Sequence, residues 1–272
     1  MIVFAQHQSV LQKLGLSTLE EVRAFQGEVI KSHGNRRRDI LRICTTDEAG
    51  APLVLFLKRS WHPYKKDGLR TLLCHGQVWS ISRQEWENSL SLQHAGLKTA
   101  PLVAFGEDCG RLWERFSFLI TEAVASKETL QHFLKSCREP CRRRLVLDAL
   151  AREVHRMHEA GLAMPDLYTR HVFVDATAEQ PVLHLIDMAR LDRRVRLSQS
   201  LRARDLAALN VTAPLCDVSP RERIRFLRVY GKRIDRKLVG RIATRMKHLL
   251  LRRKHADFQR PVGKNQLAEI AR

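Results

Sequence analysis

The residues of this chain that could do chemistry are charged side chains spaced along its middle. In chain order they are Lys58, Glu85, Asp166, His171 and Asp187. Phosphoryl transfer asks a protein for a cation on the phosphates, a carboxylate that orients the attacking hydroxyl, and acidic or polar ligands for Mg²⁺. The five residues offer a candidate for each requirement. Their types and order therefore point to phosphoryl transfer.

The two residues nearest the N-terminus also have ordinary structural explanations. Lys58 closes an apolar run, and a lysine at a strand end can simply extend its amine into water. Ser82 and Glu85 have the spacing of a helix capping box, which would account for Glu85 without catalysis. Glu87 is an alternative partner for the lysine. The sequence leaves these alternatives open.

Three further positions have a structural alternative because they fall at predicted turns. Asp166 lies in Pro-Asp-Leu-Tyr and Asp187 follows a short apolar strand, so both could be turn formers. Gly34 lies in His-Gly-Asn, which reads either as a phosphate-binding loop with one glycine or as an ordinary hairpin turn. The order of all the candidates together argues against coincidence.

The elements that must position these residues differ between the two halves of the chain. Apolar alternation and turn residues in the first half predict an antiparallel sheet interrupted by one helix. The predicted strands and helix are 27–33, 36–45, 53–57, 83–94 (helix), 101–105 and 111–121.

The second half reads as mainly helical, with two short strands. Its predicted elements are the helices 129–134, 143–160, 201–209, 220–230 and 235–253 and the strands 171–175 and 182–186. Gly96 and Gly161 end helices, and Ser219 with Glu222 forms a capping box. The class is α+β. We expect one domain over 1–272, with an N-lobe at about 20–122, a C-lobe at about 123–254, and a loose basic C-terminal tail.

Several stretches of the chain resemble the Kdo/WaaP family of lipopolysaccharide core kinases, with the closest likeness to the heptose kinases. The stretches lie between residues 20 and 233 and are AFQGEVIKSHGNRRR, LKRS, SRQEWENSLSLQHAGLKT, REVHRMHEAGLAMPDLYTRHVFVD, LIDMAR, RARDLAALN and RERIRFLRVYGKR. The resemblance implies a protein-kinase-like two-lobe fold. It also implies ATP and Mg²⁺ as cofactors and a sugar hydroxyl, of heptose or Kdo, as acceptor.

The resemblance assigns the N-lobe residues to ATP. Lys58 would hold the α- and β-phosphates and pair with Glu85, as the third-strand lysine and helix glutamate do in kinases. Gly34 would allow the backbone to approach the phosphates. Protein kinases use three glycines there, so this loop departs from their pattern.

The C-lobe residues receive the remaining roles from the same resemblance. Asp166 would be the catalytic base. Asp187, in Ile-Asp-Met-Ala, would hold Mg²⁺, and His171 would bind metal or orient phosphate. Asp205 would brace the backbone of the catalytic loop.

A second departure from the kinase pattern lies just before the candidate base. Met164-Pro165 stands where protein kinases have His-Arg, and methionine cannot donate the scaffold hydrogen bond. The loop would then be held by packing, or activity would be reduced. Only seventeen residues separate Asp187 from Asp205, which leaves little room for a peptide platform and favours a small acceptor over a protein.

The net charge of +19 draws the chain toward polyanions. From Arg221 onward there are 17 basic and 4 acidic residues, so the excess is concentrated near the C-terminus. We expect a phosphorylated glycolipid and the cytoplasmic face of the inner membrane as peripheral, electrostatic partners. The N-terminus has no signal-peptide pattern and no apolar run approaches a membrane span, which favours a cytoplasmic protein.

Other functions remain as alternatives. A catalytically impaired kinase-like protein that binds a glycolipid or a partner would fit Met164 and the sparse phosphate loop. A protein kinase is disfavoured by the short segment after Asp187. Only charge argues for nucleic-acid binding, and aromatic residues, which stack on single strands, make up 6% of the chain; we expect no nucleic acid.

The cysteines show no zinc-site spacing. They are scattered at Cys44, Cys74, Cys109, Cys137, Cys141 and Cys216. We expect most of them to be buried thiols.

Overall fold

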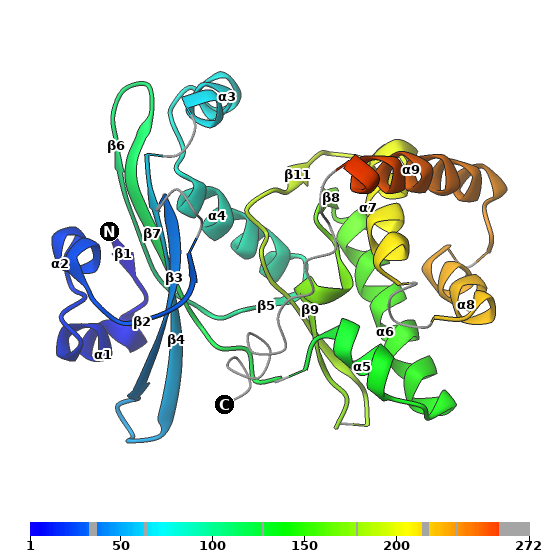
Figure 1. Cartoon of the computed structure of the whole chain (residues 1–272), viewed down its shortest axis with the longest axis horizontal. Helices are drawn as coiled ribbons and strands as arrows, with labels where there is room; N and C mark the ends of the chain where they lie inside the picture. Colours follow the sequence, from blue (N-terminus) through cyan, green and yellow to red (C-terminus); the bar gives the residue numbers. More distant parts are fainter. Residues whose placement is uncertain are drawn as a thin grey trace. The chain divides into compact units, whose positions relative to one another are not determined.

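The computed structural model describes residues 1–32, 37–62, 65–126, 128–177, 179–213, 218–231 and 233–255. Internal contacts divide the chain into two compact units, described in turn (Figure 1). The first unit comprises Met1–Leu90 and Ala100–Ala123, and the second comprises Ser91–Thr99 and the chain from Val124 onward. The first contains an antiparallel sheet and the second is mostly helical, which confirms the predicted α+β class.

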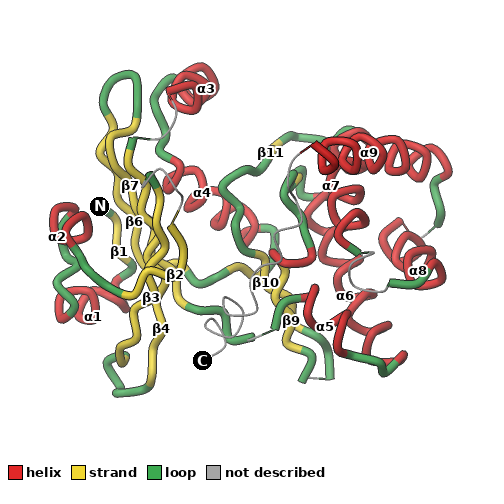
Figure 2. Tube along the Cα trace, in the orientation of Figure 1, coloured by secondary structure: helices red, strands yellow, loops and turns green. Residues whose placement is uncertain are grey.

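The first unit is built on a sheet whose strands are yellow in Figure 2. The sheet has six strands, and every neighbouring pair is antiparallel. Its spatial order is β1 (Ile2–Val3), β6 (Leu102–Cys109), β7 (Glu114–Glu122), β4 (Pro52–Trp61), β3 (Arg38–Thr46) and β2 (Glu28–Ser32). The helical elements of this unit are η1 (Ala5–His7), α1 (Gln8–Lys13), α2 (Leu19–Ala24), α3 (Lys65–His75) and α4 (Ile81–His94). The last residues of α4 belong to the second unit.

Strands β6 and β7 of the sheet are buried on both faces, and their alternate residues point to opposite sides. Phe118 and Ile120 of β7 belong to a buried cluster with Val22 of α2. Leu119, between them, packs instead in a cluster with Trp86 of α4. The short N-terminal helices and α4 therefore supply separate apolar layers.

The structure extends several predicted elements and adds others. It adds β1, α1, α2 and α3, which the sequence analysis did not expect. The expectation that Lys58 closes its strand is wrong, because β4 continues to Trp61. Helix α4 starts at Ile81, two residues before the predicted start.

The second unit packs its helices around a large apolar core. Its helices are α5 (Leu130–Ser136), α6 (Pro140–Glu159), η2 (Thr169–His171), α7 (Gln199–Thr212), α8 (Pro220–Gly231) and α9 (Arg236–His255). Helix α6 packs against α8, and α7 against α9 (Figure 2). The predicted capping box at the start of α8 is confirmed, since Ser219 and Glu222 exchange side-chain and backbone hydrogen bonds. No helix in the described part of the chain has both the length and the apolar composition needed to cross a bilayer.

Two small sheets of the second unit shape the loops between its helices. They are β5 (Lys98–Thr99) with β10 (Val182–Leu185) and β9 (Val172–Asp175), and β11 (Asp192–Arg193) with β8 (Leu162–Ala163). Gly161 ends α6 in the left-handed region with φ +76°. A Cβ there would lie 1.9 Å from the carbonyl oxygen of Arg194, so only glycine fits.

The expectation of buried thiols is wrong for the described cysteines. Three of them are exposed and two are partly buried: Cys44, Cys74 and Cys141, and Cys109 and Cys137. Cys216 lies outside the described residues. Burial was the wrong inference because most of these positions face away from the cores.

Candidate active site

The first unit brings Lys58 and Glu85 together. Leu55 and Leu57 of β4 face the cluster that includes Val22, so strand alternation turns Lys58 to the opposite face. Its Nζ lies 2.5 Å from Oε1 of Glu85 on α4. Glu85 is 7% exposed, and the lysine amine offsets the cost of burying that carboxylate.

The alternative explanation of Glu85 as a capping residue is wrong. The hydroxyl of Ser80 accepts the backbone N–H of Arg83 at 2.9 Å, so the cap lies two residues before the predicted Ser82. Ser82 Oγ instead accepts a hydrogen bond from Ser117 at 2.8 Å. The carboxylate of Glu85 thus points to Lys58 and not to the helix end.

In the second unit, Asp166 lies in a tight loop after β8. The N–H of Tyr168 donates to the carbonyl of Asp166 at 2.7 Å, and His171 Nδ1 donates to the same carbonyl at 2.8 Å. These backbone contacts fix the loop and leave the Asp166 carboxylate at its surface, 21% exposed.

The Asp166 carboxylate is held by an arginine that the sequence analysis missed. Arg190 Nε donates to Oδ2 at 2.8 Å and Arg190 Nη2 to Oδ1 at 2.5 Å. This hydrogen-bonded pair raises the pKa of the Arg190 guanidinium above its usual value. The only hint in the sequence was a basic residue three positions after Asp187, which does not by itself predict a contact.

His171 and Asp187 meet because β9 and β10 are paired. His171 comes just before β9 and Asp187 shortly after β10, and the Ile186 N–H donates to the His171 carbonyl at 3.0 Å. This places His171 Nε2 3.6 Å from Asp187 Oδ2. Asp187 has φ +60°, a left-handed conformation that aspartate tolerates better than most residues and that often marks a functional position.

The tautomer of His171 follows from its contacts. Nδ1 donates to a carbonyl, and Nε2 accepts from Arg170 Nε at 3.1 Å. Burial lowers the pKa of His171, so the ring is neutral at physiological pH. A neutral imidazole is chemically able to be a metal ligand, and a metal ion would take the Nε2 lone pair in place of the Arg170 N–H.

Asp205 lies fully buried on α7, behind the loop. Its Oδ2 accepts the backbone N–H of Met164 at 2.5 Å and lies 3.3 Å from His158 Nε2. Its Oδ1 accepts from Arg204 at 2.9 Å. Three donors, one of them charged, account for a carboxylate at this depth.

Met164 is fully buried in the apolar core of the second unit. The loop before Asp166 is thus held by side-chain packing and by the backbone contact to Asp205. His158 of α6 is part of the same arrangement, because its Nδ1 lies 2.8 Å from the hydroxyl of Tyr230 on α8. His158 is fully buried, so it has a core role.

The remaining predicted position, Gly34, lies outside the described residues. Among the residues that are described, no group of three or more His, Cys, Asp or Glu side chains could hold a metal ion by itself. The structure thus places Lys58 with Glu85 in one unit, and Asp166, His171, Asp187 and Asp205 around one loop in the other.

Comparison with known proteins gives the same picture. Residues 20–230 match the family model described as the lipopolysaccharide kinase (Kdo/WaaP) family. The lipopolysaccharide core heptose(I) kinase WaaP of Pseudomonas aeruginosa is 31% identical over 83% of this chain and 84% of its own length. The protein of the same name from Escherichia coli is 29% identical, over 79% of this chain and 82% of its own length.

A solved structure is also similar. It is described as WaaP in complex with acyl carrier protein, with a TM-score of 0.68 and 27% identity. The match covers 94% of this chain and 99% of that one. The fold, the matched range and the relatives agree: the chain belongs to the lipopolysaccharide kinase (Kdo/WaaP) family, whose members are phosphotransferases.

Proposed function

We propose that this chain transfers the γ-phosphoryl group of ATP to a heptose hydroxyl of the lipopolysaccharide inner core. The observation that carries the proposal is the 31% identity, over 83% of the chain, to a heptose(I) kinase. The family match over residues 20–230 includes all seven candidate positions, from Gly34 to Asp205. Kdo is the alternative sugar within the family.

The candidate residues divide the work as phosphoryl transfer requires. Lys58 binds the α- and β-phosphates, and the buried Glu85 holds its amine in place. Asp166 orients the acceptor hydroxyl and takes its proton. Asp205 holds the loop that carries Asp166, through the N–H of Met164. The two units together act as one catalytic domain.

The residues around Asp187 fit a Mg²⁺ ion that is completed by the phosphates of ATP. Mg²⁺ in such sites takes one or two carboxylates, substrate phosphates and water at about 2.1 Å, which sets adjacent ligand atoms about 3.0 Å apart. Asp187 Oδ2 and His171 Nε2, 3.6 Å apart, are close to that separation. Asp187 would be the main ligand, and His171 would be a second ligand through the lone pair of Nε2. When bound, Mg²⁺ would neutralise charge on the phosphates.

The structure around Met164 argues against the impaired-kinase alternative. A hydrogen bond from a loop histidine is replaced by burial of Met164 and by the backbone contact to Asp205. The Asp166 carboxylate remains at the surface, where an acceptor can reach it. Loss of the histidine therefore does not imply a disordered loop.

We also propose that the chain works as a peripheral protein at the cytoplasmic face of the inner membrane. Helices α8 and α9 carry most of the described part of the basic C-terminal excess. Exposed lysines and arginines are drawn to anionic head groups, with an energy that falls off within a Debye length, about 8 Å at physiological salt. The same charges would attract phosphate groups already present on the core saccharide.

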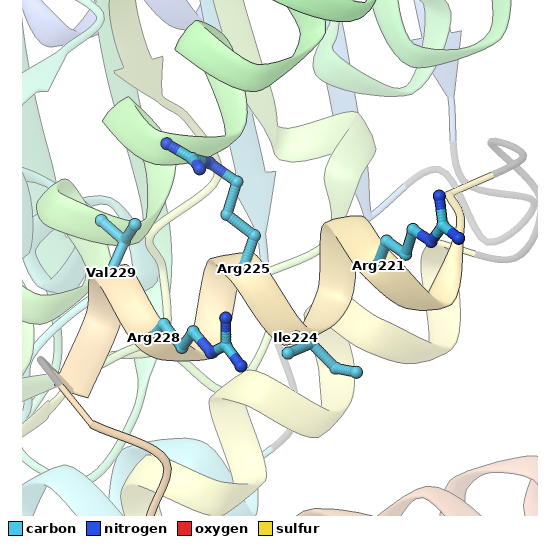
Figure 3. A pocket seen from close by; sticks show the side chains of 5 residues that line it. All are labelled: Arg221, Ile224, Arg225, Arg228 and Val229. Carbon is cyan, nitrogen blue, oxygen red and sulfur yellow. The ribbon is translucent and has the colours of Figure 1, made fainter.

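A second candidate function is binding of an acyl carrier protein, as in the similar solved structure. A hollow on α8 supports it, with a volume of about 440 Å³ and a lining of three arginines and two apolar residues. Figure 3 shows the five side chains: Arg221, Ile224, Arg225, Arg228 and Val229. All three arginines are exposed, and Arg225 also pairs with Asp148 of α6. Exposed arginines of this kind are complementary in charge to an acidic partner surface.

An apolar cavity of about 70 Å³ lies within the same unit. Two of its lining residues, Leu147 and Glu222, also line a second basic hollow. That second hollow shares Arg221 and Arg225 with the hollow whose side chains appear in Figure 3. The apolar cavity is also lined by Leu130, Leu134 and Phe226. The cavity offers an apolar environment to part of an acyl chain.

Transfer of label from ATP tests the main proposal. The wild-type chain should phosphorylate core lipopolysaccharide that lacks its phosphates, and should prefer it over free heptose and over a generic protein. The rate should fall as salt is raised, because exposed charges attract the acceptor. A preference for the protein substrate, or a rate that does not depend on salt, would contradict the proposal.

Charge reversal on α8 tests the second candidate. The double variant Arg221→Glu/Arg228→Glu should lose co-purification with acyl carrier protein. Lys13→Glu/Arg111→Glu, which changes the net charge equally at exposed positions of the first unit, should keep it. Equal binding by both double variants would refute this surface.

A further inference from the structure

Stability does not fully account for the arginine that holds Asp166. Arg190 is 60% exposed, and exposed ion pairs contribute about 0–1 kcal/mol. The contact is nevertheless bidentate, with both carboxylate oxygens engaged at 2.8 and 2.5 Å. Two parallel hydrogen bonds from one guanidinium give a fixed geometry, which matters most where a carboxylate must be aimed.

The other arginine of this loop faces a different group. Arg170 lies over the ring of Tyr168, 4.7 Å from its centroid, and donates to His171 Nε2. The guanidinium of Arg190 contacts the Asp166 carboxylate. It comes from the segment after β10, three residues beyond Asp187, so one short stretch carries both a candidate metal ligand and this cation.

The chemistry proposed for Asp166 sets the position of the transferred phosphoryl group. A general base must lie about 2.6–3.2 Å from the hydroxyl oxygen whose proton it takes. That oxygen must in turn lie about 3–3.5 Å from the phosphorus it attacks. A guanidinium in contact with Asp166 is therefore within one side-chain movement of the phosphoryl oxygens.

The bidentate contact also has a cost for catalysis. It occupies both oxygens of Asp166, and the acceptor hydroxyl needs one of them. Each carboxylate oxygen has a second lone pair, so an acceptor hydroxyl can donate to one oxygen, and its hydrogen bond competes there with that of Arg190. The guanidinium then faces the phosphoryl group, whose charge spreads over three oxygens during transfer.

We propose that Arg190 is a catalytic cation of this enzyme: it holds Asp166 while no acceptor is bound, then yields one oxygen to the acceptor hydroxyl and binds the transferred phosphoryl group. This inference rests on the proposed kinase function and adds a residue to it. The hydroxyl oxygen forms its bond to the γ-phosphorus, and its proton passes to Asp166. The bond from the γ-phosphorus to the bridging oxygen breaks, and ADP leaves with that electron pair. Arg190 forms no covalent bond and keeps its charge.

The experiment compares three variants of the full chain in the transfer assay. Arg190→Ala should lower kcat by about 10²–10³-fold, the loss typical of removing one preorganised donor to a developing charge. The dissociation constant for Mg-ATP should stay within about threefold of wild type, because the lost contact is made in the transition state. Arg190→Lys keeps the positive charge but loses the two parallel N–H donors of the guanidinium, so its kcat should lie between those of wild type and Arg190→Ala. Arg196→Ala removes an exposed arginine from the same segment and should match wild type.

Chemical rescue distinguishes a catalytic cation from a structural one. Added guanidinium should restore part of the rate of Arg190→Ala but none of the rate of Asp166→Asn. An Arg190→Ala kcat within about threefold of wild type would overturn the inference, and so would a large loss that guanidinium does not rescue. If the wild type itself transfers no phosphate to core lipopolysaccharide, the proposed function fails and this inference with it.

Discussion

The Lys58–Glu85 pair of the first unit and the Asp166 loop of the second are built in different ways. Lys58 lies within a long strand and Glu85 within a helix packed on the same sheet. Asp166 and Asp187 lie in loops, and Asp187 has a backbone conformation that few residues adopt. Because Lys58 and Glu85 belong to a strand and a helix, substituting either residue should affect both phosphate binding and the stability of the fold. Substituting Asp166 or Asp187, which lie in loops, should affect the chemistry with little effect on stability.

The loop side of the comparison predicts the largest loss. Asp166→Asn should lower kcat by about 10²–10⁴-fold, because the amide cannot take the proton of the acceptor. The melting temperature should change little, since the carboxylate is at the surface and its ion pair is exposed. Glu179→Gln, at an exposed position of the same unit, is the control. Activity within about tenfold of wild type would remove Asp166 from the mechanism.

The Lys58–Glu85 pair predicts a loss of both Mg-ATP binding and stability. Lys58→Ala should weaken Mg-ATP binding and also destabilise the protein by about 1–3 kcal/mol, since it leaves the buried Glu85 without this partner. Wild type at about 100 times the dissociation constant of Mg-ATP should gain about 2.7 kcal/mol of stability. Urea unfolding with and without nucleotide measures both quantities.

A double variant sharpens the same prediction. Lys58→Ala/Glu85→Gln should recover part of the lost stability, because position 85 then carries no charge without its partner. The double variant should not recover ATP binding. If Lys58→Ala unfolds at the same urea concentration as wild type, the pair does not stabilise the first unit, and the contrast between the pair and the Asp166 loop fails.

Substitutions of Met164 test whether core packing supports the Asp166 loop. Met164→His should destabilise the protein by about 1–3 kcal/mol, because it buries an imidazole in an apolar core. Met164→Leu, similar in volume, should cost less than about 1.5 kcal/mol. Equal stability of the two variants, measured by thermal unfolding, would show that the site accepts the histidine found in protein kinases.

The smallest expected effect is the pH dependence of stability. Burial lowers the pKa of His158 from its usual 6.5, so below that pH the unfolded chain binds a proton that the folded chain does not. The stability that His158 contributes is present above pH 6.5 and is lost as the pH falls through the lowered value. Burial lowers the pKa of His171 and His184 as well, which adds to the same trend.

Variants isolate the contribution of His158. The difference in unfolding free energy between wild type and His158→Gln should shrink as the pH falls from about 8 to about 5. His94→Gln, at an exposed position of α4, is the control variant. Parallel pH profiles for wild type and His158→Gln would contradict the assignment.

Local patterns were sufficient for the elements that hold the predicted residues. The apolar run around Leu55 and the helical spacing around Trp86 identified β4 and α4, and with them the positions of Lys58 and Glu85. The helix start was misplaced because Ser80 and Ser82 are both good capping residues. Only the folded chain shows that Ser82 is bonded to Ser117 instead.

What the sequence could not provide are contacts made by tertiary structure. Arg190 reaches Asp166 across 24 positions, through a strand pairing that no local pattern encodes. Helix α3 was missed because Gly68 within it weakens the helical pattern. Its Cβ position is crowded by the Leu112 carbonyl, 2.9 Å away, which explains why a glycine is present there.

Gly161 has a consequence for genetics. A side chain there would collide with the carbonyl of Arg194 and push β11 away from β8, the strand that leads into Met164 and Asp166. Substitution should therefore damage activity from a position that touches neither nucleotide nor sugar, and the damage should grow with temperature as local packing loosens. Gly161→Ala is thus a natural starting point for a conditional allele, active at low temperature and silent at high.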